Sequence, residues 1–165
     1  MDDGALWAKL ILIAILTSIN AFFASAEMAM VSVNNNKIKE MAEEGDKRAK
    51  TLLDISEDQT RFLSTIQVAI TLAGFFSSGS AATSISKVFG EFLRGYGIPY
   101  GGTVAFILVT LALSYITLVF GELVPKRIAL QNSEKVALNS SGAIAFASKI
   151  FYPFVKLQIG RASCR

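Results

Sequence analysis

The sequence contains no histidine and one cysteine, and each shortage excludes a class of functional site. Without histidine there is no Ser-His or Cys-His catalytic pair, no imidazole-bound zinc and no histidine-ligated haem. A lone cysteine, Cys164, excludes an internal disulfide framework and a cysteine metal cluster. A metal ion would therefore be held by oxygen atoms, which suit Mg²⁺, Ca²⁺ or Na⁺ better than softer transition metals.

Charged residues are also scarce: they make up 18% of the 165 residues, against 52% hydrophobic residues and a mean hydropathy of +0.48. A soluble globular protein carries roughly a quarter charged residues. The net charge of +3 is small, and no basic stripe is interleaved with aromatic residues, so nucleic-acid binding has no support. Length and composition together predict one small all-α membrane domain.

Three long apolar segments predict transmembrane helices, at about residues 6–33, 61–86 and 102–124. The interval from Gly95 to Gly121 contains no charge and is long enough, as a helix, to cross a hydrocarbon core of roughly 30 Å. Asp2 and Asp3 stand where a cleavable signal peptide would carry positive charges. We therefore expect the first segment to be a membrane span and not a removable leader.

Two further segments are expected to lie at the membrane surface. The charged residues 36–58 predict a pair of short amphipathic helices. Residues 136–159 are apolar but make a poor spanning helix, because Lys149 lies near the centre and Pro153 interrupts it. We predict that this second segment forms a belt or a re-entrant segment on the cytoplasmic side.

The distribution of basic residues predicts the orientation. The segment after the first span holds six Lys and Arg residues, whereas the segment after the second span holds only Lys87 and Arg94. Because cytoplasmic loops are enriched in Lys and Arg, the N-terminus should lie outside and the C-terminus in the cytoplasm. We expect a multi-pass protein of the inner (plasma) membrane, with a transmembrane domain at residues 1–159 and an unstructured tail at residues 160–165.

The candidate ion site is at the end of the third apolar segment. Glu122 enters at the membrane boundary, where an ionised carboxylate is costly unless it is paired or used. Pro125 has no N–H, and its ring clashes with the carbonyl four residues back, so the Gly121 oxygen is released. Two hard oxygen donors side by side suggest a cation site, although Glu122 could instead sit in headgroup water beside Lys126.

The first two spans contribute further polar groups to the candidate ion site. Glu27 lies at the same, inner end of its helix as Glu122, and this coincidence favours a cation site. Asn20 shares the helix face of Glu27, but helix packing alone would also explain it. The second span has a small and polar face that fits either an interhelical seam or a hydrated ion path. The members of this face include Ser64, Gln67, Thr71, Gly74 and Ser78.

Three motifs occur in a fixed order, at residues 22–29 (FFASAEMA), 64–67 (STIQ) and 120–126 (FGELVPK). Together they resemble the membrane domain of the CorC/cyclin-M (CNNM) family of magnesium transporters, over about residues 6 to 159. The resemblance implies a homodimer in the lipid bilayer, with three crossings and a juxtamembrane belt. It also implies Mg²⁺ export coupled to Na⁺ entry, and cytoplasmic CBS-type regulatory domains in the full-length protein.

Matched by motif, the family's polar cavity falls on the first span, the polar face of the second and the end of the third. The metal ligands predicted in this way are Ser25, Glu27, Gln67, Thr71, Gly121 and Glu122. The residues predicted to shape the site are Asn20, Ser64, Gly74, Ser78, Pro125 and Lys126. The sequence departs from the family near Ile70 and Gly74, where relatives often carry Asn, so Ser77, Ser78 or Thr71 would have to substitute there.

Two other function classes compete with transport. A non-transporting membrane anchor and dimerisation module would explain the polar faces by packing alone, and metal would not stabilise it. An intramembrane protease has little support, because there is no histidine and no spanning segment contains an aspartate. We therefore do not expect an enzyme.

Overall fold

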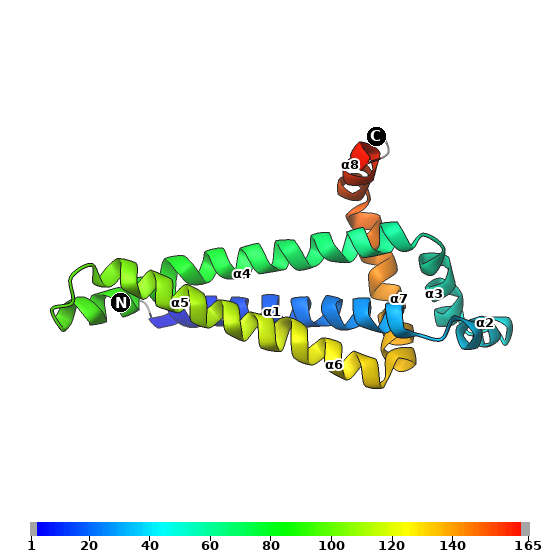
Figure 1. Ribbon diagram of the computed structural model, residues 1–165, viewed down its shortest axis with the longest axis horizontal. Helices are drawn as coiled ribbons and strands as arrows, with labels where there is room; N and C mark the ends of the chain where they lie inside the picture. The colour runs from blue at the N-terminus through cyan, green and yellow to red at the C-terminus, as the bar shows by residue number, and fades with distance from the viewer. Residues whose placement is uncertain (1–2, 163–165) are drawn as a thin grey trace.

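The computed structural model describes residues 3–162, and the elements in this part of the chain are all helical. Three long helical stretches run side by side (Figure 1). They are α1 (Asp3–Ser32), α4 (Gln59–Gly95), and α5 (Gly101–Leu118), which continues through the π-helix η1 (Val119–Leu123) into α6 (Val124–Gln131). Segments long and apolar enough to cross a membrane are Trp7–Ser32, Gln59–Gly79 and Gly101–Gln131. The predicted all-α fold with three spans is confirmed.

Helix α4 is longer than the sequence predicted. We expected a span ending near residue 86, but one helix continues to Gly95 because no proline interrupts it. The chain then reverses through Gly97, whose φ of +75° suits glycine, and α5 returns along α4. The two helices approach closely there, since a Cβ built on Gly90 would lie 3.1 Å from the Gly102 Cα.

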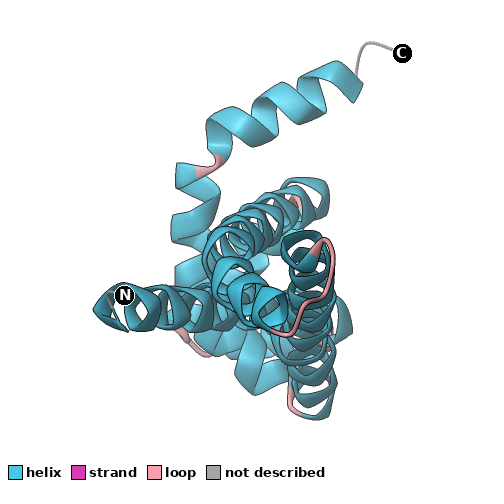
Figure 2. Ribbon diagram, turned by 90° about the vertical axis from the view of Figure 1, so that its left-hand side faces the viewer, coloured by secondary structure: helices cyan, strands magenta, loops and turns pink. Residues whose placement is uncertain are grey.

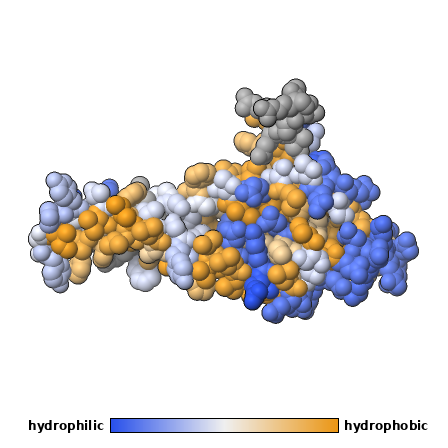
Figure 3. Space-filling view, in the orientation of Figure 1, coloured by the Kyte–Doolittle hydropathy of each residue, from blue (hydrophilic) through white to orange (hydrophobic). Residues whose placement is uncertain are grey.

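The charged segment after α1 forms the predicted pair of short helices, α2 (Asn35–Glu43) and α3 (Lys47–Glu57). Gly45, with a φ of +101°, separates them, and Asn34 and Asp46 cap their N-termini by accepting backbone hydrogen bonds. A buried apolar cluster joins this pair to the long helices and includes Ala29, Ile38, Leu52, Ala129 and Leu138. Hydrophilic residues gather at this end of the molecule (Figure 3).

Residues 136–159, the predicted belt, fall in two helices that break before Pro153: α7 (Ser133–Ile150) and α8 (Tyr152–Ala162). Helix α7 crosses the end of the long helices (Figure 1), and α8 projects away from the bundle seen end-on (Figure 2). The predicted unstructured tail is wrong for residues 160–162, because one glycine weakens a helix by only about 1 kcal/mol and α8 continues through Gly160. Residues 163–165 lie outside the described part.

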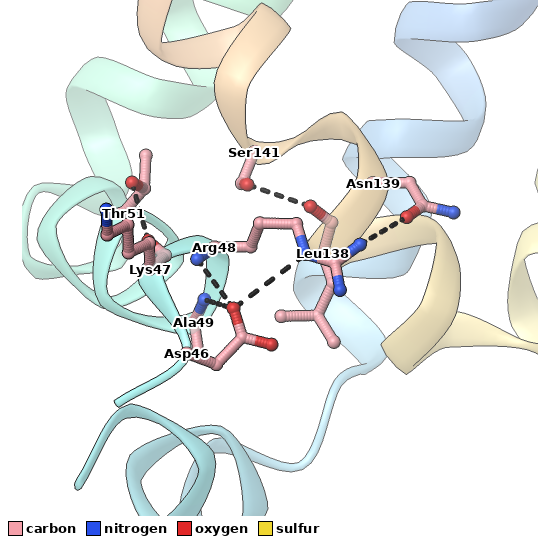
Figure 4. A network of polar contacts seen from close by, with 8 residues as sticks. All are labelled: Asp46, Lys47, Arg48, Ala49, Thr51, Leu138, Asn139 and Ser141. Carbon is pink, nitrogen blue, oxygen red and sulfur yellow. Dashed lines mark hydrogen bonds and ion pairs between the residues drawn. The ribbon is translucent and has the colours of Figure 1, made fainter. Parts of the chain in front are cut away.

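Polar contacts attach α7 to the short helices. The Arg48 guanidinium donates a hydrogen bond of 3.2 Å to the Asn139 side-chain oxygen, and Asp46 accepts from the Arg48 backbone N–H at 2.7 Å (Figure 4). Lys37 and Glu134 form an ion pair of 2.6 Å between α2 and α7. These contacts hold α7 across the end of the bundle, beside α1 and α6.

Candidate functional site

The polar site begins with a backbone oxygen where α1 meets η1. The Asn20 side-chain amide donates a hydrogen bond of 3.1 Å to the Gly121 carbonyl. Pro125 has no N–H to offer this carbonyl, and the Val124 N–H bonds Val119, five residues back, in the π-helical pattern. The Gly121 carbonyl is therefore available to a side chain of another helix, as the position of Pro125 predicted.

Gly121 also allows α1 to come this close. A Cβ at this position would lie 3.1 Å from the Asn20 amide nitrogen, 3.4 Å from the Thr17 methyl group and 3.5 Å from the Thr117 methyl group. Gly121 is buried, so even a methyl group here would crowd the Asn20 and Thr17 side chains of α1. Pro125 and Gly121 therefore act together. Pro125 leaves the Gly121 carbonyl without a helical partner, and the absence of a side chain at Gly121 lets Asn20 reach that carbonyl.

A lysine joins the two glutamates of the site. The Lys126 ammonium lies 2.9 Å from a Glu122 carboxylate oxygen and 3.2 Å from a Glu27 carboxylate oxygen. The three side chains are partly buried, with exposed fractions of 28% for Lys126, 36% for Glu122 and 23% for Glu27. The structure thus brings together the two carboxylates that the sequence placed at the inner ends of separate helices.

Asn20 contributes a second oxygen to this region. Its side chain is 5% exposed, and its Oδ1 has no hydrogen-bond partner within the described residues. The orientation of the amide is fixed, because a carbonyl only accepts and the amide nitrogen must therefore face Gly121. A buried oxygen without a donor is costly, so a ligand or water that satisfied it would be stabilised.

Ser25 lies two residues before Glu27 on α1 and is half-buried. Its hydroxyl donates to the Phe22 carbonyl at 2.8 Å. Because this bond uses only the hydroxyl proton, the lone pairs of the oxygen remain available to a cation. Ser25 therefore stays a candidate ligand.

The predicted face of α4 is directed elsewhere. Gln67, Thr71 and Ser78 are exposed and Ser64 is half-buried, and no hydrogen bond or ion pair in the described part joins them to Glu27 or Glu122. Close packing within the chain is the wrong explanation for Gly74, because a Cβ there would meet nothing within 4 Å. Among the described side chains of this helix, the buried polar ones are instead Thr65, Ser77 and Ser86.

Two contacts of the site were missed in the sequence. Lys126 was expected to be a surface cation that helps orientation, and its spacing of four residues from Glu122 did indicate that pair. Its contact with Glu27 depends on how α1 packs against α6, which no local pattern reveals. The same holds for Asn20, whose face was recognised but whose partner was not.

The donor set as a whole is made of oxygen. Among the residues whose side chains the structure describes, no three acidic or cysteine side chains gather in one place, so the site offers two carboxylates together with neutral oxygens. Mg²⁺ is commonly held by one or two carboxylates and keeps several waters. The residues present therefore fit a hard, partly hydrated cation.

Comparison with known proteins assigns the family. The model of the cyclin M transmembrane N-terminal domain matches residues 10–163. Similar proteins include UPF0053 protein sll0260 of Synechocystis sp. (32% identical, covering 95% of this chain and 36% of that protein) and UPF0053 protein YugS of Bacillus subtilis (31%, covering 94% and 37%). A protein named polyamine export protein, from Haemophilus influenzae, is 30% identical over 88% of this chain and 34% of its own length.

The chain thus spans about a third of the length of these relatives. The matched residues include α1, α4, η1 and the site between them. With its three apolar helices, this multi-pass membrane domain belongs to the cyclin M transmembrane domain (CNNM) family.

Proposed function

We propose that this chain is the membrane domain of a transporter that exports Mg²⁺ in exchange for Na⁺. The observation that carries the proposal is that the Glu27 and Glu122 carboxylates share the Lys126 ammonium, while Asn20 holds the carbonyl of Gly121, the residue before Glu122. A carboxylate at the end of an apolar helix is costly unless it is paired or binds an ion, and here both carboxylates contact Lys126. The substrate is the Mg²⁺ ion itself, and the family assignment supports the proposal.

In this proposal each group has a distinct role. Glu122 and Glu27 supply the charge that balances Mg²⁺, while the Gly121 carbonyl and the Ser25 hydroxyl supply neutral oxygens. Asn20 keeps the Gly121 carbonyl in place. Waters complete the six positions that Mg²⁺ requires, because this ion loses its hydration shell reluctantly. Gln67 and Thr71 on α4 stay predicted ligands, and Na⁺ stays the predicted coupling ion.

The proposal is tested by ion flux in proteoliposomes that contain the purified chain, with Mg²⁺ and Na⁺ gradients varied independently. We expect Mg²⁺ flux that depends on an opposing Na⁺ gradient. A membrane anchor and dimerisation module would give no flux, and Mg²⁺ would not raise its melting temperature. Mg²⁺-dependent stabilisation without flux would instead indicate a site that needs the rest of the protein for transport.

A second substrate class has its own supporting observation. The Lys126 ammonium is a primary amine on a four-carbon chain, and both carboxylates hold it at hydrogen-bond distance. The same contacts would suit the end of a polyamine, and one relative is named polyamine export protein. Adding putrescine or spermidine in place of Mg²⁺ in the flux assay distinguishes the two substrates.

We further propose that the protein lies in the inner (plasma) membrane as a homodimer and that CBS-type domains follow it in the cytoplasm. The N-terminus would then be outside, and α7 would lie on the cytoplasmic side. In a Cys164→Ser background, single cysteines placed near Asp3 and near residue 160 should react with a membrane-impermeant thiol reagent from opposite sides. If both reacted from the same side, the three-crossing topology would be refuted.

A further inference from the structure

We infer that Lys126 is a built-in competitor for the transported cation, a role that rests on the proposed function of the same site. Its ammonium already occupies the space between the Glu27 and Glu122 carboxylates, at 3.2 Å and 2.9 Å. The 2.9 Å contact has the length of a charge-assisted hydrogen bond, and in both contacts the ammonium takes up an oxygen at the place where a metal bridging the two carboxylates would bind. The cation and the ammonium therefore cannot hold both carboxylates at once.

Electrostatic repulsion strengthens this exclusion. Two positive charges a few ångströms apart repel more strongly at a partly buried site than in water, because the effective dielectric constant is lower there. The Lys126 side chain is only 28% exposed in the paired position, so solvent screens the repulsion incompletely. A cation that binds Glu122 must consequently displace the ammonium.

The Lys126 ammonium can move toward water when a cation displaces it. Lys126 lies in the first turn of α6, where the long apolar helix approaches the hydrophilic end of the molecule. Its flexible four-carbon stem can move the ammonium toward water while the helix stays in place. The neighbouring Arg127 is exposed and forms no ion pair within the described residues, so the region around α6 is open to solvent on that side.

Exchange between lysine and cation would help a transporter in both halves of its cycle. With no cation bound, the ammonium neutralises carboxylates that would otherwise be unpaired near the membrane interior. With a cation bound, the free ammonium remains tethered nearby and returns when the ion leaves. The ammonium thereby lowers the free-energy cost of the two carboxylates in the cation-free state. It also lowers the affinity of the site for the cation.

The competing explanation is that Lys126 is only a structural link between α1 and α6. Both explanations predict that Lys126→Gln lowers the melting temperature of the cation-free protein, so stability alone does not separate them. They differ in the sign of the change in affinity. A competitor that is removed leaves the carboxylates free and tightens cation binding, whereas a lost structural link loosens the site and weakens it.

The first experiment is a Mg²⁺ titration of the wild type, Lys126→Gln, Lys126→Arg and the control Arg127→Gln. We expect Lys126→Gln to tighten Mg²⁺ binding by about two- to fivefold, the factor that partly exposed ion pairs supply. Lys126→Arg keeps the positive charge and should bind Mg²⁺ like the wild type, as should Arg127→Gln. Weaker or unchanged binding by a folded Lys126→Gln variant overturns the inference.

The second experiment needs no variant and therefore does not depend on folding of a mutant. An amine-reactive reagent is applied to the wild type with and without Mg²⁺, and modification of each lysine is measured by mass spectrometry. Mg²⁺ should increase the modification of Lys126, and the half-maximal increase should occur at the Mg²⁺ concentration that half-saturates binding. Modification of the exposed Lys149 should not change with Mg²⁺. A Lys126 signal that Mg²⁺ leaves unchanged refutes the competition.

The two experiments also separate this inference from the proposed function. If the wild type binds Mg²⁺ through Glu122 but neither the titration nor the labelling responds as expected, the transporter proposal stands and the competition fails. If no variant binds Mg²⁺, both fail. Labelling that responds to spermidine and not to Mg²⁺ would also overturn the inference for Mg²⁺ and assign the site to polyamines.

Discussion

Glu122→Gln is expected to weaken Mg²⁺ binding by about a hundredfold, which corresponds to ~3 kcal/mol. The change keeps the size of the side chain but removes the charge that pairs with the cation. The remaining carboxylate, Glu27, lies on another helix and is still held by Lys126, so it cannot replace the lost charge without further movement. A hydrogen bond to a charged group contributes roughly 1.5–3 kcal/mol, and loss of a direct ligand should lie at the upper end of that range.

Two further variants serve as controls for the Mg²⁺ titration of Glu122→Gln. Glu40→Gln makes the same chemical change on the exposed surface of α2, outside the site, and should leave Mg²⁺ binding unchanged. Lys126→Gln alters the direct partner of Glu122 and should not weaken binding. If Glu122→Gln and Lys126→Gln weakened binding equally in the titration, Glu122 would be a surface carboxylate in headgroup water and no ligand.

The parts of the molecule that the sequence predicted are those set by local chemistry. Long uncharged intervals predicted the three spans, and the charged residues between the first two spans predicted the pair of short helices, which Gly45 separates. Pro125 predicted a released carbonyl at Gly121 without any tertiary information. The missing N–H of proline and the clash of its ring both act on the carbonyl four residues back. In each case the cause and its effect lie within a few turns of the same chain.

What the sequence did not predict depends on the rotation and packing of helices. On α4 the polar face lies next to the face that packs on α1, and the sequence did not show which of these two helix faces is buried. The structure buries Ile66, Ala69 and Ala73 and exposes Gln67 and Thr71. Small apolar residues allow close helix packing as well as small polar ones do, so composition did not distinguish the faces.

The site shows the same limit. Asn20, Glu27 and Ala24 were recognised as one face of α1, yet the partners of that face lie about a hundred residues away. Helix periodicity gives the side of a helix on which a residue lies, and it says nothing about the helix that covers that side. The lysine that pairs with both carboxylates is thus a property of the packed fold.

Pro125→Ala is the change that tests whether the backbone builds the site. A carbonyl oxygen has two lone pairs, and in the wild type one of those on Gly121 accepts the Asn20 amide at 3.1 Å. Proline leaves the second lone pair free on the side of its own helix. Alanine restores an N–H four residues after Gly121, which can take up that lone pair and leave none for a cation.

We therefore expect Pro125→Ala to keep or raise the melting temperature, because a helix break is removed, and to weaken Mg²⁺ binding about tenfold to a hundredfold. That range corresponds to the roughly 1–3 kcal/mol of an unmade bond to a charged group. The control is Pro153→Ala, the same substitution at the start of α8, which should leave Mg²⁺ binding unchanged. Thermal melts and Mg²⁺ titrations of both variants make the comparison. If Pro125→Ala folds well and binds Mg²⁺ like the wild type, then Gly121 is no ligand, and the carbonyl serves only to hold Asn20 and α1 against η1.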